Sequence, residues 1–175
     1  IKKKWKFNLD DISVPSVNYR PDRYKTQFKN PSDVWKIPLV SGNSLERTGH
    51  PSQYPEKLVE RIILAVTKKN DLVLDPFMGS GTTAKVAKDL GRNYVGYETN
   101  DEYINIAKKR LNKKMIKNQK IIIGDCRKKL KEIKKESVSL VVTSPPYNIG
   151  KKYGKYKDNI SLEEWKKLIT EVFEL

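Results

Sequence analysis

The sequence predicts an α/β protein with a doubly wound, mostly parallel sheet. Four short apolar runs, each typical of a buried strand, alternate with segments of helical periodicity; they lie at 72–75, 93–98, 120–125 and 139–144. Strands that alternate with helices of this length form parallel sheets through crossover connections. Each run also leads into polar, glycine-rich or proline-rich residues, and such sheets bind their ligands at the carboxyl ends of the strands.

The first part of the chain lacks these patterns. Residues 1–48 carry scattered prolines among aromatic and basic residues, without a sustained period, which predicts loops and short extended pieces. We therefore divide the chain into an irregular segment, 1–48, and an α/β domain, 49–175. Because the sequence begins with IKKKWKF and not with an initiator methionine, we interpret it as a fragment or a trimmed chain.

Two predicted helices flank the first strand. Residues 55–69 repeat apolar side chains at the spacing of an amphipathic helix, and the polar pair Asn70-Asp71 breaks the pattern. After the strand, the run DPFMGSGTT leads into a second amphipathic helix, AKVAKDLG, which ends at Gly91.

Three further helices follow the later strands. The segment from 101 to about 114 carries one apolar stripe, and the basic run 127–136 predicts a short helix. The last helix, within 161–175, begins with Ser161 as its N-cap and Glu164 at the third helical position, which is a capping box.

The charge balance favours a polyanionic partner. Lys and Arg number 36 against 21 Asp and Glu, so the formal net charge is +15. Such a surface attracts nucleic acid. A proteome that is rich in lysine throughout is the alternative explanation.

The composition argues against several classes of protein. Cys126 is the single cysteine and His50 the single histidine, which disfavours an internal disulfide and a cysteine- or histidine-based metal site. No apolar stretch approaches the roughly 18 residues that a membrane span needs, and the N-terminus has no signal-peptide core. We therefore expect a cytoplasmic protein without a metal and without a membrane partner.

The run DPFMGSGTT predicts a ligand-binding loop after the first strand. Gly79 and Gly81 allow a sharp turn and a close approach of backbone to ligand, and a helix N-terminus follows. The lysine of a nucleoside-triphosphate loop is absent, and the glycine spacing is not that of dinucleotide-binding proteins. Asp75, which precedes the loop, could accept hydrogen bonds from the ammonium group of a cofactor or anchor the amides of the loop.

The other three strands also end in candidate site residues. Glu98 is placed to accept hydrogen bonds from two ribose hydroxyls; the alternative is an exposed glutamate at the entry of a helix. Asp125 could bind an adenine amino group. Ser144-Pro145-Pro146-Tyr147 is either a simple turn, because Pro-Pro dipeptides mark loops, or part of a site.

Three motifs in these positions resemble those of one enzyme family. LVLDPFMGSGTT, TSPPY and the segment GHPSQYPEKLVERII (49–63) resemble the amino-methyltransferases that modify DNA bases with S-adenosylmethionine, and the motifs are most like those of the β group. The matching segments lie within residues 35–150. The resemblance implies a Rossmann-like S-adenosylmethionine-dependent methyltransferase fold. Because sheets of this family usually hold more strands than the four predicted here, we expect the fold to be incomplete in this chain.

The resemblance also implies roles around the cofactor. His50, Pro51 and Gln53 would close over its methionine part, Glu98 would hold the ribose and Asp125 the adenine. The glycine loop and its flanks would line the amino-acid and ribose region with Asp75, Pro76, Phe77, Gly79, Gly81, Thr82 and Thr83. Cys126 is expected to be a small buried side chain near the cofactor and not the nucleophile of ring-carbon methylation.

The same resemblance makes Ser144-Pro145-Pro146-Tyr147 the catalytic loop. An exocyclic amine is a poor nucleophile, and the Ser144 hydroxyl and the Pro145 carbonyl would accept its hydrogen bonds and stabilise the charge that develops on it. The prolines stiffen the loop, and Tyr147 would stack on a base flipped out of the DNA helix. The residues beyond the loop that are placed to contact phosphates are Lys151, Lys152, Tyr153 and Lys155.

The order of the motifs departs from that of the β group. There the SPPY half precedes target recognition and the glycine-loop half, whereas here TSPPY follows the glycine loop. Residues 1–48 resemble the end of a target-recognition region, 49–126 a cofactor half and 127–175 a catalytic-loop part. The chain could be a permuted enzyme cut short, the junction of two tandem enzymes, or half of an enzyme assembled from two chains. In each case a flanking region or a second chain would supply target recognition.

Together these observations predict a site-specific DNA methyltransferase that acts on an exocyclic amino group, as part of a restriction–modification system. Cytosine N4 is slightly favoured over adenine N6, because aspartate or asparagine in place of the serine is commoner among adenine enzymes. An RNA base methyltransferase is the alternative enzyme. The alternative outside enzymes is a cofactor- and nucleic-acid-binding subunit that is inactive without a partner chain.

Overall fold

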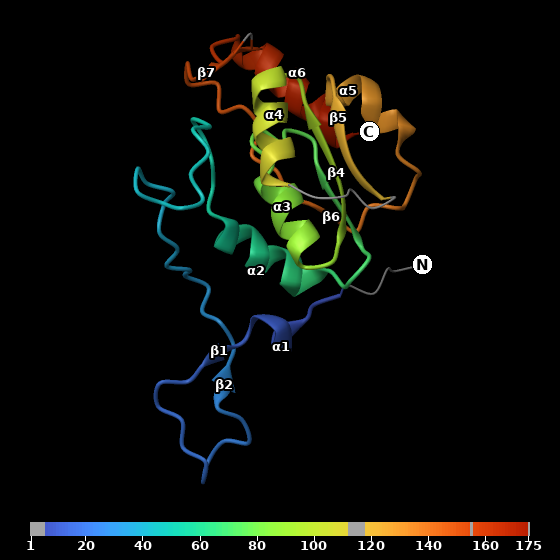
Figure 1. Cartoon of the computed structure of the whole chain (residues 1–175). Coiled ribbons are helices and arrows are strands. Elements are labelled where there is room, and N and C mark those ends of the chain that lie inside the picture. The colour runs from blue at the N-terminus through green and yellow to red at the C-terminus, as the bar shows by residue number, and fades with distance from the viewer. Residues whose placement is uncertain (1–5, 112–117, 155, 175) are drawn as a thin grey trace.

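The computed structural model describes residues 6–111, 118–154 and 156–174. Its centre is a four-stranded parallel sheet with the order β5-β4-β3-β6 (Figure 1). The strands are β3 (Leu72–Asp75), β4 (Asn93–Glu98), β5 (Gln119–Ile123) and β6 (Leu140–Val141). The predicted parallel α/β fold is confirmed.

The strand order reverses between β3 and β6. The chain runs from β3 outward to β4 and β5, and then returns to the other side of β3 with β6. Val73 accordingly pairs with Tyr94 of β4 on one side and with Leu140 of β6 on the other. Open α/β sheets bind ligands beyond the carboxyl ends of the strands at such a reversal, because the loops that follow the two central strands meet there.

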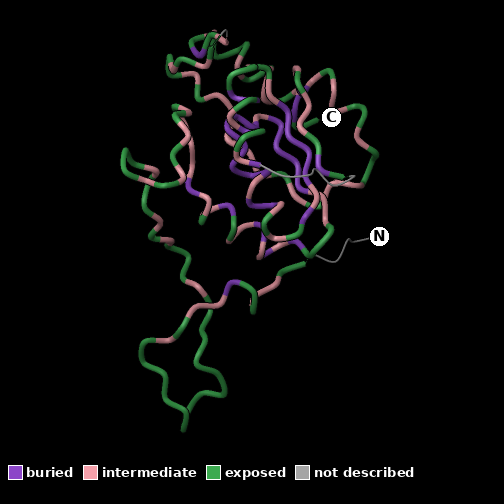
Figure 2. Tube along the Cα trace, viewed as in Figure 1, coloured by how far each residue is buried: buried purple, intermediate pink, exposed green. Residues whose placement is uncertain are grey.

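Helices cover both faces of the sheet, as a doubly wound fold requires. The core beneath one face includes Val73 and Tyr94, and the core beneath the other includes Leu74 and Val95, because successive strand residues point to opposite sides. The first core is covered by α2 (Glu56–Val66), α3 (Thr82–Asp89) and α4 (Asp101–Arg110). The second is covered by α5 (Cys126–Lys129) and α6 (Leu162–Phe173). Figure 2 shows the strands between them as the buried centre.

Residues 6–49 form an arm that extends away from the sheet (Figure 1). Its regular elements are short, as predicted for this irregular segment: α1 (Leu9–Ile12), β1 (Val14–Pro15) and β2 (Phe28–Lys29). Asn8 ties the arm to the end of α2, because its side-chain amide donates to the carbonyls of Leu64 and Thr67, each at 2.8 Å. Beyond α1 the arm is mostly exposed (Figure 2).

Two strands are shorter than predicted. β6 ends at Val141 and not at 144, because the chain leaves the sheet for the Pro145-Pro146 turn, whose residues have no amide hydrogen to donate to a ladder. β5 ends at Ile123 and not at 125. There Gly124 adopts a φ of 135°, and Asp125 becomes the N-cap of α5.

The predicted helices are present with changed boundaries. The basic run 127–136 forms the end of α5 and the 3-10 turn η1 (Leu130–Glu132) in place of one helix. α4 ends at Arg110, and residues 112–114 of its predicted continuation lie outside the described ranges. α6 begins with the predicted capping box. Across the described residues, the longest helix falls short of the length and apolar character that a membrane span requires.

A second hairpin follows the tetrapeptide and was not predicted. It consists of β7 (Lys152–Tyr153) and β8 (Tyr156–Lys157). The hairpin lies over the N-terminal end of α4, where Tyr103 donates to the carbonyl of Lys152 at 3.4 Å.

Candidate active site

One pocket lies at the carboxyl ends of the strands, where the loops after β3 and β6 meet. Its walls come from the segment before α2, the glycine loop, the ends of β4 and β5, the tetrapeptide and the β7–β8 hairpin. The predicted site residues in its lining are His50, Gln53, Pro76, Phe77, Gly79, Thr82, Glu98, Asp125, Cys126, Ser144, Pro146 and Tyr153. The structure therefore brings the glycine loop and the tetrapeptide, which are far apart in sequence, to one pocket.

The glycine loop adopts a backbone that other residues rarely tolerate. Gly79 and Gly81 have φ values of 52° and 79°. A Cβ atom on Gly79 would lie 2.8 Å from Nε2 of His50, whereas one on Gly81 would lie 2.9 Å from Cβ of Ala107. Gly79 thus lets the loop pass close to His50 inside the pocket. Gly81 lies behind the lining and allows α3 to pack closely on α4.

Glu98 is fixed at the end of β4 by backbone amides. Its carboxylate accepts hydrogen bonds from the amides of Gly79 at 2.9 Å and of Thr99 and Asn100 at 2.8 Å each. The side chain lines the pocket. An acceptor that is held in one orientation and still faces a pocket is suited to a ligand with neighbouring hydroxyl groups.

Asp75 lies behind the pocket and is 1% exposed. Its carboxylate accepts hydrogen bonds from the hydroxyls of Thr143 at 2.6 Å and Tyr54 at 3.2 Å, and from the amide of Phe77 at 3.2 Å. Burial raises the pKa of this carboxyl to about 6, despite the hydrogen bonds that lower it. Of the two predicted roles for Asp75, this position fits the anchoring of loop amides and not contact with an ammonium group.

Tyr54 and Thr83 extend this buried network. The Tyr54 hydroxyl lies 2.6 Å from Oγ1 of Thr83. The Thr83 hydroxyl in turn donates to the carbonyl of Val142 at 3.3 Å. Burial and the charge of Asp75 raise the pKa of Tyr54, so the phenol stays protonated. The network joins the segment before α2, the start of α3 and the ends of β3 and β6.

His50 is neutral and lies within the pocket. Burial, with smaller contributions from Lys151 and Arg110, lowers its pKa to about 4. Its Nδ1 accepts a hydrogen bond from the amide of Ser52 at 3.2 Å, so the proton resides on Nε2. The ring meets Tyr103 edge to face, with 4.4 Å between the centroids. This arrangement suits a packing or contact role and not that of a general base.

Gln53 and Pro51 hold different positions in the segment before α2. The Gln53 side chain accepts hydrogen bonds from the amide and the hydroxyl of Thr48, at 2.9 and 2.7 Å, and donates to the carbonyl of Glu46 at 2.6 Å. It therefore fixes the chain that leads into His50. Pro51 is exposed.

Asp125 is engaged by Arg127. Its carboxylate accepts hydrogen bonds from Nε of Arg127 at 3.0 Å and from Nη2 at 2.5 Å, which lower the pKa of Asp125. Arg127 also donates to Glu171 of α6 at 3.2 Å. Cys126 between them is buried, and burial raises the pKa of its thiol to about 11. This places Cys126 as the small buried side chain that the sequence predicted.

The tetrapeptide reaches the pocket with Ser144 and Pro146. Oγ of Ser144 lies 2.7 Å from the hydroxyl of Tyr147. Tyr147 is 46% exposed. The carbonyl of Pro146 accepts a hydrogen bond from Nε1 of Trp165 at 2.7 Å. The loop is therefore held from α6 while its serine and tyrosine bond to each other.

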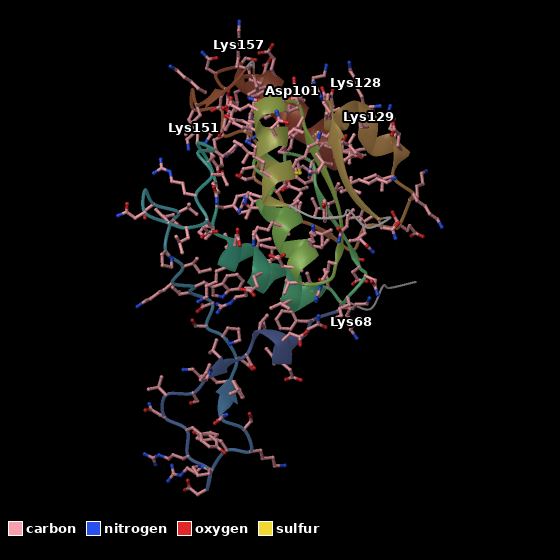
Figure 3. All side chains as sticks on the ribbon, in the orientation of Figure 1. Lys68, Asp101, Lys128, Lys129, Lys151 and Lys157 are labelled. Carbon is pink, nitrogen blue, oxygen red and sulfur yellow. The ribbon has the colours of Figure 1, made fainter. Side chains whose placement is uncertain are left out.

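The residues predicted to contact phosphates differ in their contacts and exposure. The Lys151 ammonium donates to Oγ of Ser52 at 2.9 Å, and the Tyr153 hydroxyl lies 2.8 Å from the same oxygen. Figure 3 labels Lys151 on the side of the molecule where the segment before α2 lies. Lys152 is exposed, and Lys155 lies outside the described residues. Tyr153 thus lines the pocket, Lys151 adjoins this wall through Ser52, and Lys152 is exposed.

Sequence reasoning missed several residues of the site. Tyr54 and Thr143 directly adjoin predicted motifs, so their position was the available signal. Arg127 belongs to a basic run, where charge alone does not show which side chain turns inward. Trp165 carries no local signal, because it acts through the carbonyl of Pro146, which lies earlier in the chain.

Comparison with known proteins places the chain in a family. The sequence model described as DNA methylase matches residues 1–109. The chain belongs to this DNA methylase family. A second model, described as RNA cap guanine-N2 methyltransferase, matches residues 70–172 of the chain. The two matches overlap at the glycine loop, and the tetrapeptide lies in the second.

Individual relatives match the chain over part of their length. It is 46% identical over 114 residues to the Type II methyltransferase M.BglII of Bacillus subtilis, which covers 59% of the chain and 32% of that relative. It is 42% identical over 120 residues to the DNA adenine methyltransferase YhdJ of Escherichia coli K12, covering 62% of the chain and 40% of the relative. The chain therefore spans well under half of the length of these relatives.

A solved structure supports the fold of the chain. SMU.1697c of Streptococcus mutans, a methyltransferase-fold protein solved in complex with SAH, aligns with a TM-score of 0.51 at 16% identity, over 70% of this chain and 66% of that one. At this identity the likeness concerns the fold, and it confirms the predicted Rossmann-like methyltransferase architecture.

Proposed function

We propose that this chain takes part in the site-specific methylation of an exocyclic amino group in DNA, within a restriction–modification system and with S-adenosylmethionine as the methyl donor. The observation that carries the proposal is that the glycine loop, Glu98 and Ser144 line the same pocket. The names of the relatives, a Type II methyltransferase and a DNA adenine methyltransferase, support the same activity. Target recognition would come from a flanking region or a second chain.

The residues of the pocket fit S-adenosylmethionine. The fixed carboxylate of Glu98 offers acceptors for the two ribose hydroxyls, and Asp125, oriented by Arg127, would accept from the adenine amino group. Because Gly79 has no side chain, its backbone lies close to His50 in the wall of the pocket, with no Cβ between them. Because His50 is neutral, it does not repel a cationic ligand. When bound, S-adenosylmethionine supplies a methyl group on a positively charged sulfur.

Ser144 would prepare the amine for attack. Its hydroxyl now bonds to that of Tyr147, and an incoming amine would replace Tyr147 as the partner. By accepting hydrogen bonds from the amine, Ser144 and the carbonyl of Pro145 would favour a pyramidal nitrogen and stabilise its developing positive charge. Tyr147, released from Ser144, would stack on the flipped base.

We expect cytosine N4 to be the methylated group, because the tetrapeptide begins with a serine. Adenine N6 is the direct competitor, because one relative is named as a DNA adenine methyltransferase. Incubation with isotopically labelled S-adenosylmethionine and mixed-sequence DNA, followed by digestion and mass spectrometry of the nucleosides, separates the two products. Labelled N4-methyldeoxycytidine supports the first expectation, and labelled N6-methyldeoxyadenosine replaces it.

Methylation of an RNA base is the second candidate. The match of the RNA cap methyltransferase model to residues 70–172, which include the tetrapeptide, favours it. RNA added to the same incubation tests it, and label on RNA alone would overturn the DNA proposal. Cofactor binding without transfer to either nucleic acid would favour a subunit that requires a partner chain.

A further inference from the structure

Asp158 is a buried carboxylate that has no part in the reaction as proposed. The residue follows β8 directly and is 2% exposed. A carboxylate withdrawn from water requires hydrogen-bond donors to offset its lost hydration. The identity of those donors therefore shows what Asp158 does.

The donors are backbone amides of the turn that follows the tetrapeptide. Oδ1 accepts from Asn148 at 2.8 Å, and Oδ2 accepts from Ile149 at 3.1 Å and from Lys151 at 3.0 Å. The main-chain oxygen of Asp158 accepts from Gly150 at 2.6 Å. Asn148 and Gly150 have positive φ values of 57° and 78°. A turn with this backbone presents successive amides to one acceptor, which holds the turn in place.

This turn also places Lys151 against Tyr147. The Lys151 ammonium lies 5.3 Å from the centre of the Tyr147 ring and donates to Ser52 at 2.9 Å. A cation at this distance from an aromatic face is attracted to it. Because the Tyr147 hydroxyl bonds to Ser144, a continuous series of contacts leads from Asp158 to the proposed acceptor of the amine.

We propose that Asp158 is a positioning residue for methyl transfer, which holds the turn 148–151 so that Lys151 fixes the Tyr147 ring beside Ser144. Its consequence for catalysis rests on the proposed function, whereas its geometry rests on the hydrogen bonds above. Loss of the carboxylate would leave every group of the tetrapeptide chemically intact but displaced.

NMR of the full chain tests the geometry without requiring activity. Asp158→Asn keeps the shape of the side chain, but only one of its two terminal atoms can still accept, so the hydrogen bonds at one oxygen position are lost and those at the other lose the assistance of the charge. The amide protons of Asn148, Ile149 and Lys151 should shift upfield, and that of Gly150, bonded to the main-chain oxygen, should shift least.

The indole of Trp165 reports on the tetrapeptide from a different element, because its N–H donates to the carbonyl of Pro146. If Asp158 positions the tetrapeptide, Asp158→Asn should also move the indole N–H resonance, which Trp165→Phe assigns. Asp89→Asn is the matched control, since it removes the same charge from an exposed residue bonded to Lys85 on α3. A Trp165 resonance that is unchanged in Asp158→Asn overturns the proposal.

Kinetics test the consequence for the reaction. A misplacement of about 1 Å costs about 10²-fold, so Asp158→Asn should lower kcat by about 10- to 100-fold while the Kd of S-adenosylmethionine changes by less than about 3-fold. A Kd that rises in parallel with the loss of kcat contradicts positioning. If the wild-type chain transfers no methyl group on its own, as expected of a subunit that requires a partner chain, the NMR experiment still decides the role of Asp158.

Lys151→Met tests the outer contacts if Asp158→Asn does not fold. The change keeps the stem and removes the ammonium from Tyr147 and Ser52. The ring resonances of Tyr147 should move, and Lys151→Arg, which retains a cation, should restore them. Identical Tyr147 resonances in the wild type and Lys151→Met overturn the proposal.

Discussion

The two loops at the reversal of strand order are held in place by different means. The glycine loop is fixed largely by its own backbone, through the positive φ values of Gly79 and Gly81 and the hydrogen bond from Gly79 to Glu98. The tetrapeptide loop is fixed by side chains from other parts of the chain, with Trp165 on one side and Asp158 on the other. The glycine loop thus depends mainly on the conformation of its own backbone, whereas the tetrapeptide loop depends on side chains that hold its backbone from outside the loop.

The largest effect on stability and cofactor binding is expected from a substitution that the backbone conformation of the glycine loop does not tolerate. Gly81→Val places a β-branched side chain at a φ of 79° and 2.9 Å from Cβ of Ala107. Backbone strain and overpacking each cost about 1–3 kcal/mol, so urea unfolding should show a large loss of stability and calorimetry a loss of cofactor binding.

Gly91→Val is the control for this prediction. Gly91 has a φ of 74°, but its nearest neighbouring atom would lie 3.7 Å from the new Cβ, on Lys69. The variant should therefore show the cost of strain alone and bind the cofactor normally. Equal losses in the two variants would mean that packing of α3 on α4 is not decisive.

The second effect separates chemistry from binding in the tetrapeptide. Ser144→Ala should lower the rate of methyl transfer by about 10²- to 10³-fold, because one acceptor for the developing charge is lost, while the Kd of the cofactor stays nearly constant. Tyr147→Phe removes the hydroxyl that bonds to Ser144 and keeps the ring, so its effect on the rate should be far smaller. Loss of cofactor binding in Ser144→Ala would refute this role of the serine.

Asp75 connects the two loops and adds a pH dependence. Its pKa of about 6 in the folded protein lies above the ordinary value of 3.8, so the folded state binds the proton more tightly than the unfolded chain does. The resulting stabilisation is present below the unfolded value and is lost as the pH rises through about 6, by about 3 kcal/mol.

Asp75→Asn is the reference for measuring this pH dependence, because asparagine does not ionise. The unfolding free energy of the wild type, relative to that of the variant, should decrease between pH 4 and 7 in urea titrations. A difference that is constant over this range would show that Asp75 titrates alike in the folded and unfolded protein.

The smallest effect is expected at Cys126. Because burial raises its pKa to about 11, the thiolate is scarce at pH 8 and iodoacetamide should label the folded protein far more slowly than the unfolded one. Cys126→Ala should cost about 1 kcal/mol of stability and leave methyl transfer close to the wild-type rate. Fast labelling of the folded protein, or a rate that collapses in Cys126→Ala, would contradict a purely structural thiol.

Features with local causes were predictable from the sequence. The bounds of β3 and β4 agree with the predicted ranges, because polar and glycine-rich residues end the apolar runs abruptly. The capping box at Ser161 formed as predicted. Gly79, Glu98 and Ser144 were found because motifs at the carboxyl ends of parallel strands converge.

Features that depend on distant partners were not predictable. The burial of Asp75 follows from Thr143, which arrives with a strand that pairs later in the chain. Lys151 was expected to face phosphates because of its charge, yet the turn held by Asp158 directs its ammonium to Ser52. A sequence pattern records which groups are present, but the direction of a long side chain depends on how the backbone folds back.

The short ladder of β6 distinguishes the two loops in local stability. β6 pairs with β3 at Leu140 and Val141, whereas β4 pairs with β5 from Tyr94 to Glu98. Segments with few ladder bonds and buried contacts open locally at a lower free energy than the core. We therefore expect the tetrapeptide to open locally more readily than the glycine loop and Glu98. Hydrogen exchange would detect this difference as faster exchange at Val142 than at Val95.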